Sequence, residues 1–253
     1  MADYRVNVPI SGVMAEASHQ AHCVSEALYG ERVTIIGHKD DWAAVRQHHD
    51  GYIGYMPIAH LEPLPAQDNE ANVPTHWVHQ RSTLLFQAPD IKSPVMQRIP
   101  FAAQLTLNAP ANTPFSQTSC GLFVWHAHCL PVQQAHSSDP IQLARTHFLG
   151  TPYRWGGRSP EGADCSGLIQ LLARSKGLSI PRDSVDQELA IASVVPAGDY
   201  QAGDLVYWPG HTGILTSPDD LLHATAFSLN CLIEPLANVV ERAGPISSVR
   251  RRF

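Results

Sequence analysis

Several features that assign a protein to a class are missing from this chain of 253 residues. No apolar stretch approaches the roughly 18 residues of a membrane-spanning helix, so no membrane partner is expected. The formal net charge is −6 and no long run of Lys and Arg occurs, which argues against nucleic-acid binding. A basic run at residues 249–253 is short, and we interpret it as a solvated terminal strand.

Cysteine is scarce and its number is odd. The five cysteines lack the spacing of a disulfide framework, which fits reduced thiols in a cytosol; they are Cys23, Cys120, Cys129, Cys165 and Cys231. The first residues include an acid at Asp3 and are not followed by the apolar segment of a signal peptide. A cytoplasmic protein is therefore expected, with a periplasmic or extracellular one as the alternative.

What the chain does contain is 20 prolines and 17 glycines, with 44% hydrophobic and 16% charged residues. This composition is typical of a soluble globular protein. The frequent turn residues favour short strands over a helical bundle. The pattern along the chain predicts three domains, over residues 1–66, 70–133 and 138–253.

The first two segments follow one plan. Short strands separated by glycine-containing turns are predicted at residues 32–36, 42–46 and 51–56, which is typical of a small β-barrel. Strands at 82–86 and 104–107 give the second segment the same plan.

The two segments also end alike. The run at 121–126 parallels the run at 51–56, and similar tails follow at 60–63 and 128–131. We interpret this as a weak internal repeat of about 60 residues, too irregular for a solenoid.

The third segment changes character. Asp139 and Pro140 predict the start of a helix over 141–149. Further helices are expected over 165–176, ending at Gly177, and over 183–192. Four strands follow, at 204–208, 212–216, 221–225 and 231–234. Helices first and strands after predict an α+β domain with helices packed on an antiparallel sheet.

Cys165 stands where a glycine-rich turn meets an apolar helix. The helix N-terminus and a facing histidine are expected to lower the pKa of its thiol. His211 and His223 fall on neighbouring strands, so both imidazoles are expected to face the helix start, with His223 bound to His211 and fixing its tautomer. The backbone N–H of Cys165 is a natural oxyanion donor, and the Tyr153 hydroxyl is a second.

Other chemistry-bearing residues receive plainer interpretations. Each of the four remaining cysteines is expected to be a buried small hydrophobe. The cluster at 126–129 contains two histidines and a cysteine but lacks a second ligand pair at a recognised spacing, so no metal and no cofactor are expected. Arg182 is a candidate for meeting a substrate carboxylate.

A series of motifs in the third segment resembles one known family. Its members are Tyr153-Arg154-Trp155-Gly156-Gly157, Asp164-Cys165-Ser166-Gly167, Pro181-Arg182-Asp183-Ser184 with Gln187, Gly203-Asp204-Leu205-Val206-Tyr207-Trp208, His211-Thr212-Gly213-Ile214 and Leu222-His223-Ala224. In this order they resemble the NlpC-type cysteine peptidases. The resemblance implies a papain-like core that cleaves bacterial cell-wall peptides, with Cys165 as nucleophile, His211 as base and His223 as orienting group.

The first two segments resemble bacterial SH3-like barrels. The first does so through residues 25–31 and 54–56, and the second is more diverged. In family members of this layout the first barrel closes part of the cleft, so that short peptides with a free N-terminal L-alanine are accepted. The resemblance implies acidic and polar contacts to such a peptide from both domains, namely Glu26, Tyr52 (with Tyr55 as its competitor), Asp164, Ser166 and Ser184.

The predicted function is hydrolysis of the γ-D-glutamyl–diamino acid bond of free murein peptides, with meso-diaminopimelate as the typical diamino acid, in peptidoglycan recycling. One alternative is an exported hydrolase that acts on polymeric wall. Another is a wall-binding protein with a vestigial catalytic domain. The preferred diamino acid, the role of the second barrel and the oligomeric state stay open.

Overall fold

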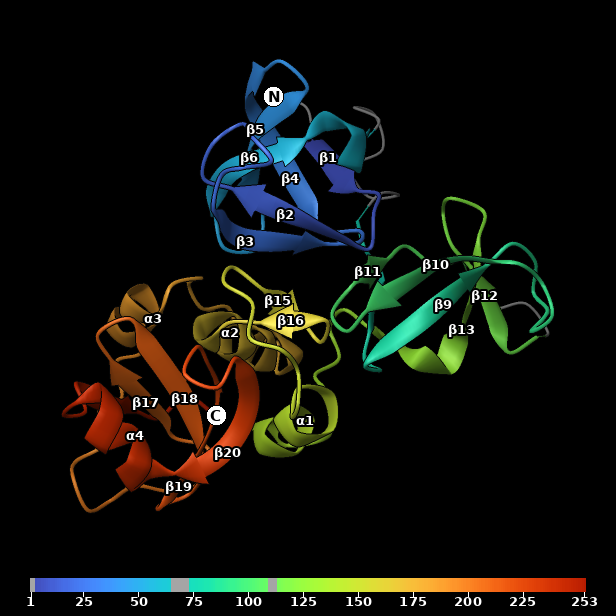
Figure 1. The fold of residues 1–253 in the computed structure, drawn as a ribbon. Helices are drawn as coiled ribbons and strands as arrows, with labels where there is room; N and C mark the ends of the chain where they lie inside the picture. Colours follow the sequence, from blue (N-terminus) through green and yellow to red (C-terminus); the bar gives the residue numbers. More distant parts are fainter. Residues whose placement is uncertain (1–2, 65–72, 109–112) are drawn as a thin grey trace. The chain divides into compact units, whose positions relative to one another are not determined.

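The computed structural model describes residues 3–64, 73–108 and 113–253 (Figure 1). The chain forms two compact units, residues 1–135 and 136–253, which we call unit 1 and unit 2. No helix in the described parts combines the length and apolarity needed to cross a membrane.

Residues 3–64 of unit 1 form one antiparallel sheet in the order β3-β2-β6-β5-β4-β1-β7. Its elements are β1 Asp3–Val6, β2 Ile10–Met14, β3 Cys23–Leu28, β4 Arg32–Lys39, β5 Trp42–Gln47, β6 Ile53–Pro57, the 3-10 helix η1 Ile58–His60 and β7 Leu61–Pro63. The alternating inward side chains Val13, Val33, Val45 and Met56 make its core. The strands predicted at 32–36, 42–46 and 51–56 are β4, β5 and β6.

The predicted closed barrel is not present in the described residues. The sheet ends at β3 on one side and at β7 on the other, and no described ladder joins these two edges. Closure of a barrel requires such a ladder, and β7 has only three residues, all of them paired with β1. The prediction was correct about the strands and wrong about closure.

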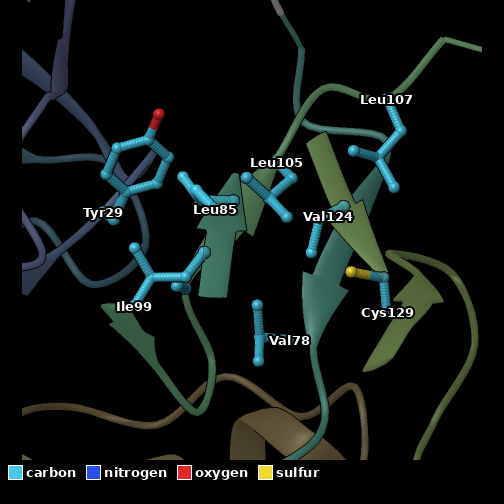
Figure 2. Packing of buried hydrophobic residues seen from close by; sticks show 9 residues of the cluster. Tyr29, Val78, Leu85, Ile99, Leu105, Leu107, Val124 and Cys129 are labelled. Atoms are coloured by element: carbon cyan, nitrogen blue, oxygen red, sulfur yellow. The ribbon is translucent and has the colours of Figure 1, made fainter. Parts of the chain in front are cut away.

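Residues 73–135 form two small sheets, β10-β9-β13-β12 and β11-β8-β14. The elements are β8 His76–Val78, β9 Ser82–Phe86, β10 Val95–Pro100, β11 Gln104–Leu105, β12 Phe115–Gln117, β13 Phe123–Trp125, the 3-10 helix η2 His126–His128 and β14 Cys129–Pro131. Their buried apolar residues form one cluster, in which Tyr29 from the turn after β3 takes part (Figure 2). The two parts of unit 1 therefore share a core.

The predicted internal repeat has a structural basis. Each part of unit 1 ends in a 3-10 turn followed by a three-residue strand. The last histidine of each turn binds a hydroxyl through its Nδ1, His60 to Ser11 at 2.8 Å and His128 to Thr83 at 2.8 Å. The similar tails at 60–63 and 128–131 thus form the same kind of histidine–hydroxyl hydrogen bond.

Unit 2 is an antiparallel sheet, β20-β19-β18-β17-β21, with helices packed on it. Its elements are α1 Pro140–His147, β15 Arg158–Ser159, β16 Gly162–Ala163, α2 Cys165–Ser175, α3 Ser184–Ala190, β17 Leu205–Trp208, β18 His211–Ser217, β19 Asp220–Thr225, β20 Asn230–Pro235, α4 Leu236–Ala243 and β21 Ser248–Arg250. Helix α2 packs against β18 and β19. The three predicted helices and four predicted strands are all present.

Two elements of unit 2 differ from expectation. Helix α4 was not predicted. The basic end of the chain does form a strand, β21, which pairs with β17. It is not simply solvated, because alternate side chains of a strand face opposite sides of the sheet. Val249 is buried in the core, and Arg251 forms an ion pair with Asp204.

Candidate active site

Cys165 is the first residue of α2, and the residue before it caps the helix. The Asp164 carboxylate accepts a hydrogen bond from the Gly167 N–H at 2.7 Å, which satisfies one of the free donors of the first turn. The apolar side chains of α2 are buried, so packing fixes the helix and with it the position of Cys165.

The glycine-rich turn approaches the start of α2 closely. A Cβ atom on Gly167 would lie 2.2 Å from the Gly157 carbonyl oxygen, a contact that only glycine avoids. Gly156 has φ of 78° and donates its N–H to Asp164 at 2.9 Å. These glycines let the turn lie against the helix start, so the turn and the nucleophile form one rigid piece.

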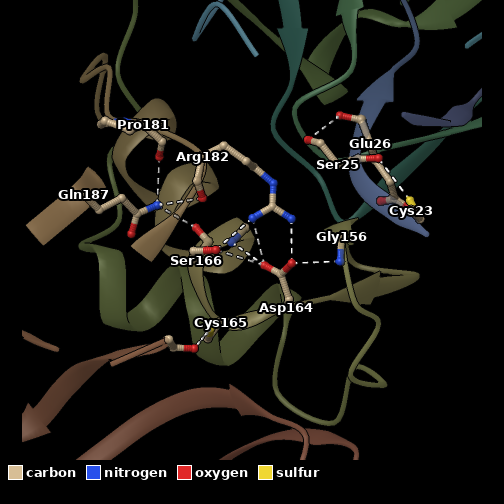
Figure 3. A network of polar contacts seen from close by, with 12 residues as sticks. Cys23, Ser25, Glu26, Gly156, Asp164, Cys165, Ser166, Pro181, Arg182 and Gln187 are labelled. Atoms are coloured by element: carbon tan, nitrogen blue, oxygen red, sulfur yellow. Dashed lines mark hydrogen bonds and ion pairs between the residues drawn. The ribbon is translucent and has the colours of Figure 1, made fainter. Parts of the chain in front are cut away.

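The Asp164 carboxylate is the centre of a polar network (Figure 3). Arg182 binds both its oxygens, at 3.0 and 2.6 Å, and also donates to the Ser166 hydroxyl at 2.8 Å. With the helix cap, the Gly156 N–H and a 3.3 Å bond from Ser166, five donors meet one carboxylate. These donors fix the position of the carboxylate at the start of α2.

This network bears on three sequence predictions. Arg182 is buried and bound to Asp164, and its expected contact with a substrate carboxylate stays a prediction. The expected contacts of Asp164 and Ser166 with a substrate ammonium stay predictions. Ser184 is the buried first residue of α3, and Gln187 on the same helix donates to the Ser166 carbonyl oxygen at 3.0 Å.

His211 and His223 lie on neighbouring strands, as predicted. Leu222 of β19 pairs with Ile214 of β18, which places His223 diagonally across from His211. The His211 Nε2 and His223 Nδ1 atoms are 2.7 Å apart. A Cβ on Gly213 would lie 2.9 Å from the His223 Cβ, so the glycine makes room for the second ring.

Two residues beyond His223 were not predicted from the sequence. Its Nε2 binds Glu234 of β20 at 2.8 Å, and Arg242 of α4 binds both carboxylate oxygens of Glu234. The register of the β19–β20 hairpin is the feature that identifies this acid. Leu221 pairs with Glu234, so Glu234 lies diagonally opposite His223 on the neighbouring strand.

The expected low pKa of the thiol is wrong for this structure. Burial raises the pKa of Cys165 to about 11, and the nearby Asp164 charge raises it further. Backbone hydrogen bonds and Arg182 act in the opposite direction but are outweighed. Burial, with the neighbouring His223, lowers the pKa of His211 to about 4. Both groups are therefore neutral near pH 7, in place of a thiolate–imidazolium pair.

The sulfur nevertheless faces the strand that carries the base. The Cys165 thiol has the Gly210 carbonyl oxygen as an acceptor at 4.0 Å, and the backbone of Thr212 also interacts with the sulfur. His211 lies between these two residues. Since its Nε2 is bound to His223, its Nδ1 is the atom left for proton exchange with the thiol.

The remaining predicted residues lie as follows. Tyr153 is half-buried; burial raises the pKa of its hydroxyl, and the neighbouring Cys165 and Asp164 act in the same direction, so the phenol is neutral near pH 7. Glu26 lies in β3, and Tyr52 lies in the turn between β5 and β6, both in unit 1. Their part in substrate binding stays a prediction. Within residues 3–64, 73–108 and 113–253, no group of three or more His, Cys, Asp or Glu side chains is arranged so that it could bind a metal ion.

Comparison with known proteins identifies the chain's relatives. Residues 150–240 match the NlpC/P60 family, and residues 13–61 match the bacterial dipeptidyl-peptidase Sh3 domain. A probable endopeptidase of Corynebacterium glutamicum (strain R) is 40% identical, with 67% of each chain covered. The chain belongs to the NlpC/P60 family. It is a cysteine peptidase with a bacterial SH3 domain ahead of the catalytic domain.

Two longer matches cover nearly all of this NlpC/P60 chain. The γ-D-glutamyl-L-lysine dipeptidyl-peptidase of Bacillus subtilis (strain 168) is 27% identical, over 90% of this chain and 81% of the relative. The crystal structure of an NlpC/P60 family protein from Bacillus cereus ATCC 10987 has a TM-score of 0.83 and covers 98% of this chain and 99% of its own. At 21% identity that likeness shows a shared fold.

Proposed function

We propose that this peptidase hydrolyses the γ-D-glutamyl–diamino acid bond of murein peptides that begin with a free L-alanine. The observation that carries the proposal is Cys165 at the start of α2, facing the strand whose His211 is bound to His223. The relatives named dipeptidyl-peptidase support the bond, because such enzymes release two residues from a free N-terminus.

In the proposed reaction the thiol of Cys165 attacks the γ-carbonyl carbon while its proton passes to Nδ1 of His211. The backbone N–H of Cys165 and the Tyr153 hydroxyl donate to the oxyanion. His211 then gives the proton to the leaving amine, and the C–N bond breaks. Water, deprotonated by His211, cleaves the thioester and restores the thiol.

The proposed steps start from neutral groups. His211, whose pKa lies near 4, is unprotonated at pH 7, so its Nδ1 lone pair is free of a proton when the substrate binds. Substrate binding covers the site and brings the acyl carbon to the sulfur, so that proton transfer and attack occur together. Before a substrate arrives, burial keeps the Cys165 thiol protonated.

The residues proposed to recognise the substrate's free amine are acidic and polar: Glu26, Tyr52, Asp164, Ser166 and Ser184. Recognition of a free amine excludes peptides whose N-terminus continues into a longer chain, which is specificity by exclusion. The proposed setting is peptidoglycan recycling in the cytoplasm, where released peptides with free amines occur. The diamino acid proposed after the scissile bond is lysine or meso-diaminopimelate.

The test is a digest of synthetic L-Ala-γ-D-Glu peptides ending in lysine or in meso-diaminopimelate, each with a free or an acetylated amine. Release of L-Ala-γ-D-Glu from the free-amine peptides alone is expected, and Cys165→Ala is expected to abolish it. Equal cleavage of acetylated peptides would contradict the substrate proposal.

A parallel incubation with intact sacculi separates the alternatives. Soluble fragments from sacculi would favour a hydrolase of polymeric wall. Sedimentation of the protein with sacculi, without thiol-dependent turnover of any peptide, would favour a wall-binding protein.

A further inference from the structure

We propose that Glu234 and Arg242 are positioning residues that set the tautomers of His223 and His211 and so leave the base nitrogen of His211 unprotonated. The inference rests on the proposed function in one respect, that His211 is the base. Neither residue touches the reacting atoms. Each acts through the histidine pair.

The three side chains occupy one face of three neighbouring strands. His211 stands in β18, His223 in β19 and Glu234 in β20, each diagonal to the next. Diagonal neighbours on one face lie within reach of long side chains. The observed contacts, 2.7 Å between the two rings and 2.8 Å from His223 to the carboxylate, form a continuous line.

The direction of the hydrogen bonds follows from the acid end. An ionised carboxylate only accepts, so the Nε2 atom of His223 must carry the proton that points to Glu234. A neutral imidazole has a single N–H, which leaves the Nδ1 of His223 as an acceptor. His211 must then donate from its Nε2, and its own Nδ1 carries the lone pair. One charge at Glu234 thus decides which nitrogen of His211 is basic.

Arg242 keeps Glu234 ionised, the form in which its carboxylate only accepts hydrogen bonds. Its guanidinium binds Glu234 through two nitrogens, and this contact is the main cause that lowers the pKa of the carboxyl. The guanidinium carbon also lies 4.4 Å from the centre of the Phe227 ring, a cation–π distance. Arg242 is therefore held from two sides, by the acid and by the hairpin that joins β19 to β20.

A plain surface ion pair is the competing interpretation. The side chains of Arg242 and Glu234 are 26% and 14% exposed, and ion pairs near the surface contribute little to stability. A surface pair would affect stability slightly and would leave the histidine tautomers unchanged. The two interpretations therefore differ in a measurement that does not depend on stability.

The experiment combines long-range proton–nitrogen NMR of the histidine rings with kcat for L-Ala-γ-D-Glu-lysine. In the wild type both His211 and His223 are expected to carry their proton on Nε2. Glu234→Ala is expected to move protons to Nδ1 in a part of the population and to lower kcat about 10- to 100-fold, as loss of an outer partner of a functional histidine does. KM is expected to change little.

Two variants serve as controls. Glu234→Gln keeps an amide oxygen that can accept from both His223 and Arg242, so it is expected to keep the wild-type tautomers and to recover most of the lost kcat. Arg251→Ala removes a matched pair, since Arg251 binds both oxygens of Asp204. That pair lies beside Leu205, at the end of β17 opposite Trp208, which pairs with His211. Its removal is expected to leave kcat unchanged.

Unchanged tautomers in Glu234→Ala would overturn the proposal, whatever happens to kcat. Altered tautomers with full kcat would overturn it as well. If Glu234→Ala does not fold, Glu234→Leu provides the same comparison, because it also removes the acceptor of His223, and unchanged tautomers in that variant would overturn the proposal in the same way. The NMR result needs no substrate, so it stands even if the peptide proves not to be cleaved.

Discussion

Two arginine–carboxylate pairs flank the candidate catalytic residues, and they differ in burial. Arg182 and Asp164 lie beside the nucleophile, with side chains 1% and 10% exposed. Arg242 and Glu234 lie behind the histidines, with side chains 26% and 14% exposed. The geometry is otherwise alike, because each arginine binds both oxygens of its acid.

The difference in burial assigns different tasks to the two pairs. Removing one member of a buried pair leaves a charge without compensation, which destabilises a protein strongly. The Asp164 pair also joins the turn, the helix cap and Arg182 from the segment before α3, so it anchors the nucleophile. The Glu234 pair adds little stability and acts on proton positions. An arginine–carboxylate pair thus stabilises the fold beside Cys165 and sets proton positions behind the histidines.

The largest effect is expected from Arg182→Ala. This change leaves the Asp164 charge buried with only backbone and hydroxyl donors, so the free energy of unfolding is expected to fall by about 3–5 kcal/mol. Urea unfolding of the isolated variant measures it. The double change Asp164→Asn with Arg182→Leu removes both charges, and its loss should be smaller than that of Arg182→Ala. A loss below about 1 kcal/mol for Arg182→Ala would remove the contrast with the second pair.

The next effect concerns the charge state of the nucleophile. With burial raising the pKa of Cys165 to about 11, the thiol is protonated below that pH, and its thiolate fraction rises only in alkaline solution. Ultraviolet thiolate absorbance, with Cys165→Ser as the blank for the other cysteines, follows this titration. A thiolate signal already complete at about pH 7 would show an ion pair with His211. Glu234→Gln is expected to leave the midpoint in place, because the acid is two rings away.

Much of this site was accessible from the sequence because its signals are local. Asp164 before an apolar run predicts a cap, and Gly156 and Gly157 before it predict a tight turn. The histidines were found because each opens or follows a short apolar strand. Glu234 and Arg242 were not found, since their roles depend on strand register and on α4. Register is set by pairing along the whole hairpin, which short motifs do not contain.

The prediction of a closed barrel was wrong for a related reason. Alternation of apolar residues predicts strands and the face that each one buries. It does not predict whether the edges β3 and β7 meet, because that depends on the tilt and stagger of the whole sheet. The prediction of a low thiol pKa was wrong because a sequence indicates where the helix starts but not how deeply Cys165 is buried.

A smaller effect is expected at Gly213, which separates the two histidine strands. In Gly213→Ala the new Cβ would lie 2.9 Å from the Cβ of His223, so β18 and β19 must move apart at the ring pair. Overpacking of this kind costs about 1–3 kcal/mol. Thermal unfolding and kcat are the measurements, and kcat should fall because the His211–His223 bond lengthens. Gly37→Ala is the matched control, since its Cβ would lie 3.6 Å from its nearest neighbour, Ala44, which is an ordinary contact.

The smallest stability effect is expected from Arg242→Ala. The arginine is partly exposed and its loss leaves Glu234 near solvent, so the free energy of unfolding should fall by at most about 1 kcal/mol. Without the guanidinium, the pKa of Glu234 rises toward its ordinary value, and the acid limb of the kcat profile should move to higher pH. Because the two pairs share no partner, the stability losses of Arg182→Ala and Arg242→Ala should add in the double variant. A non-additive result would mean that the two pairs are energetically coupled, and the division of tasks between them would then not hold.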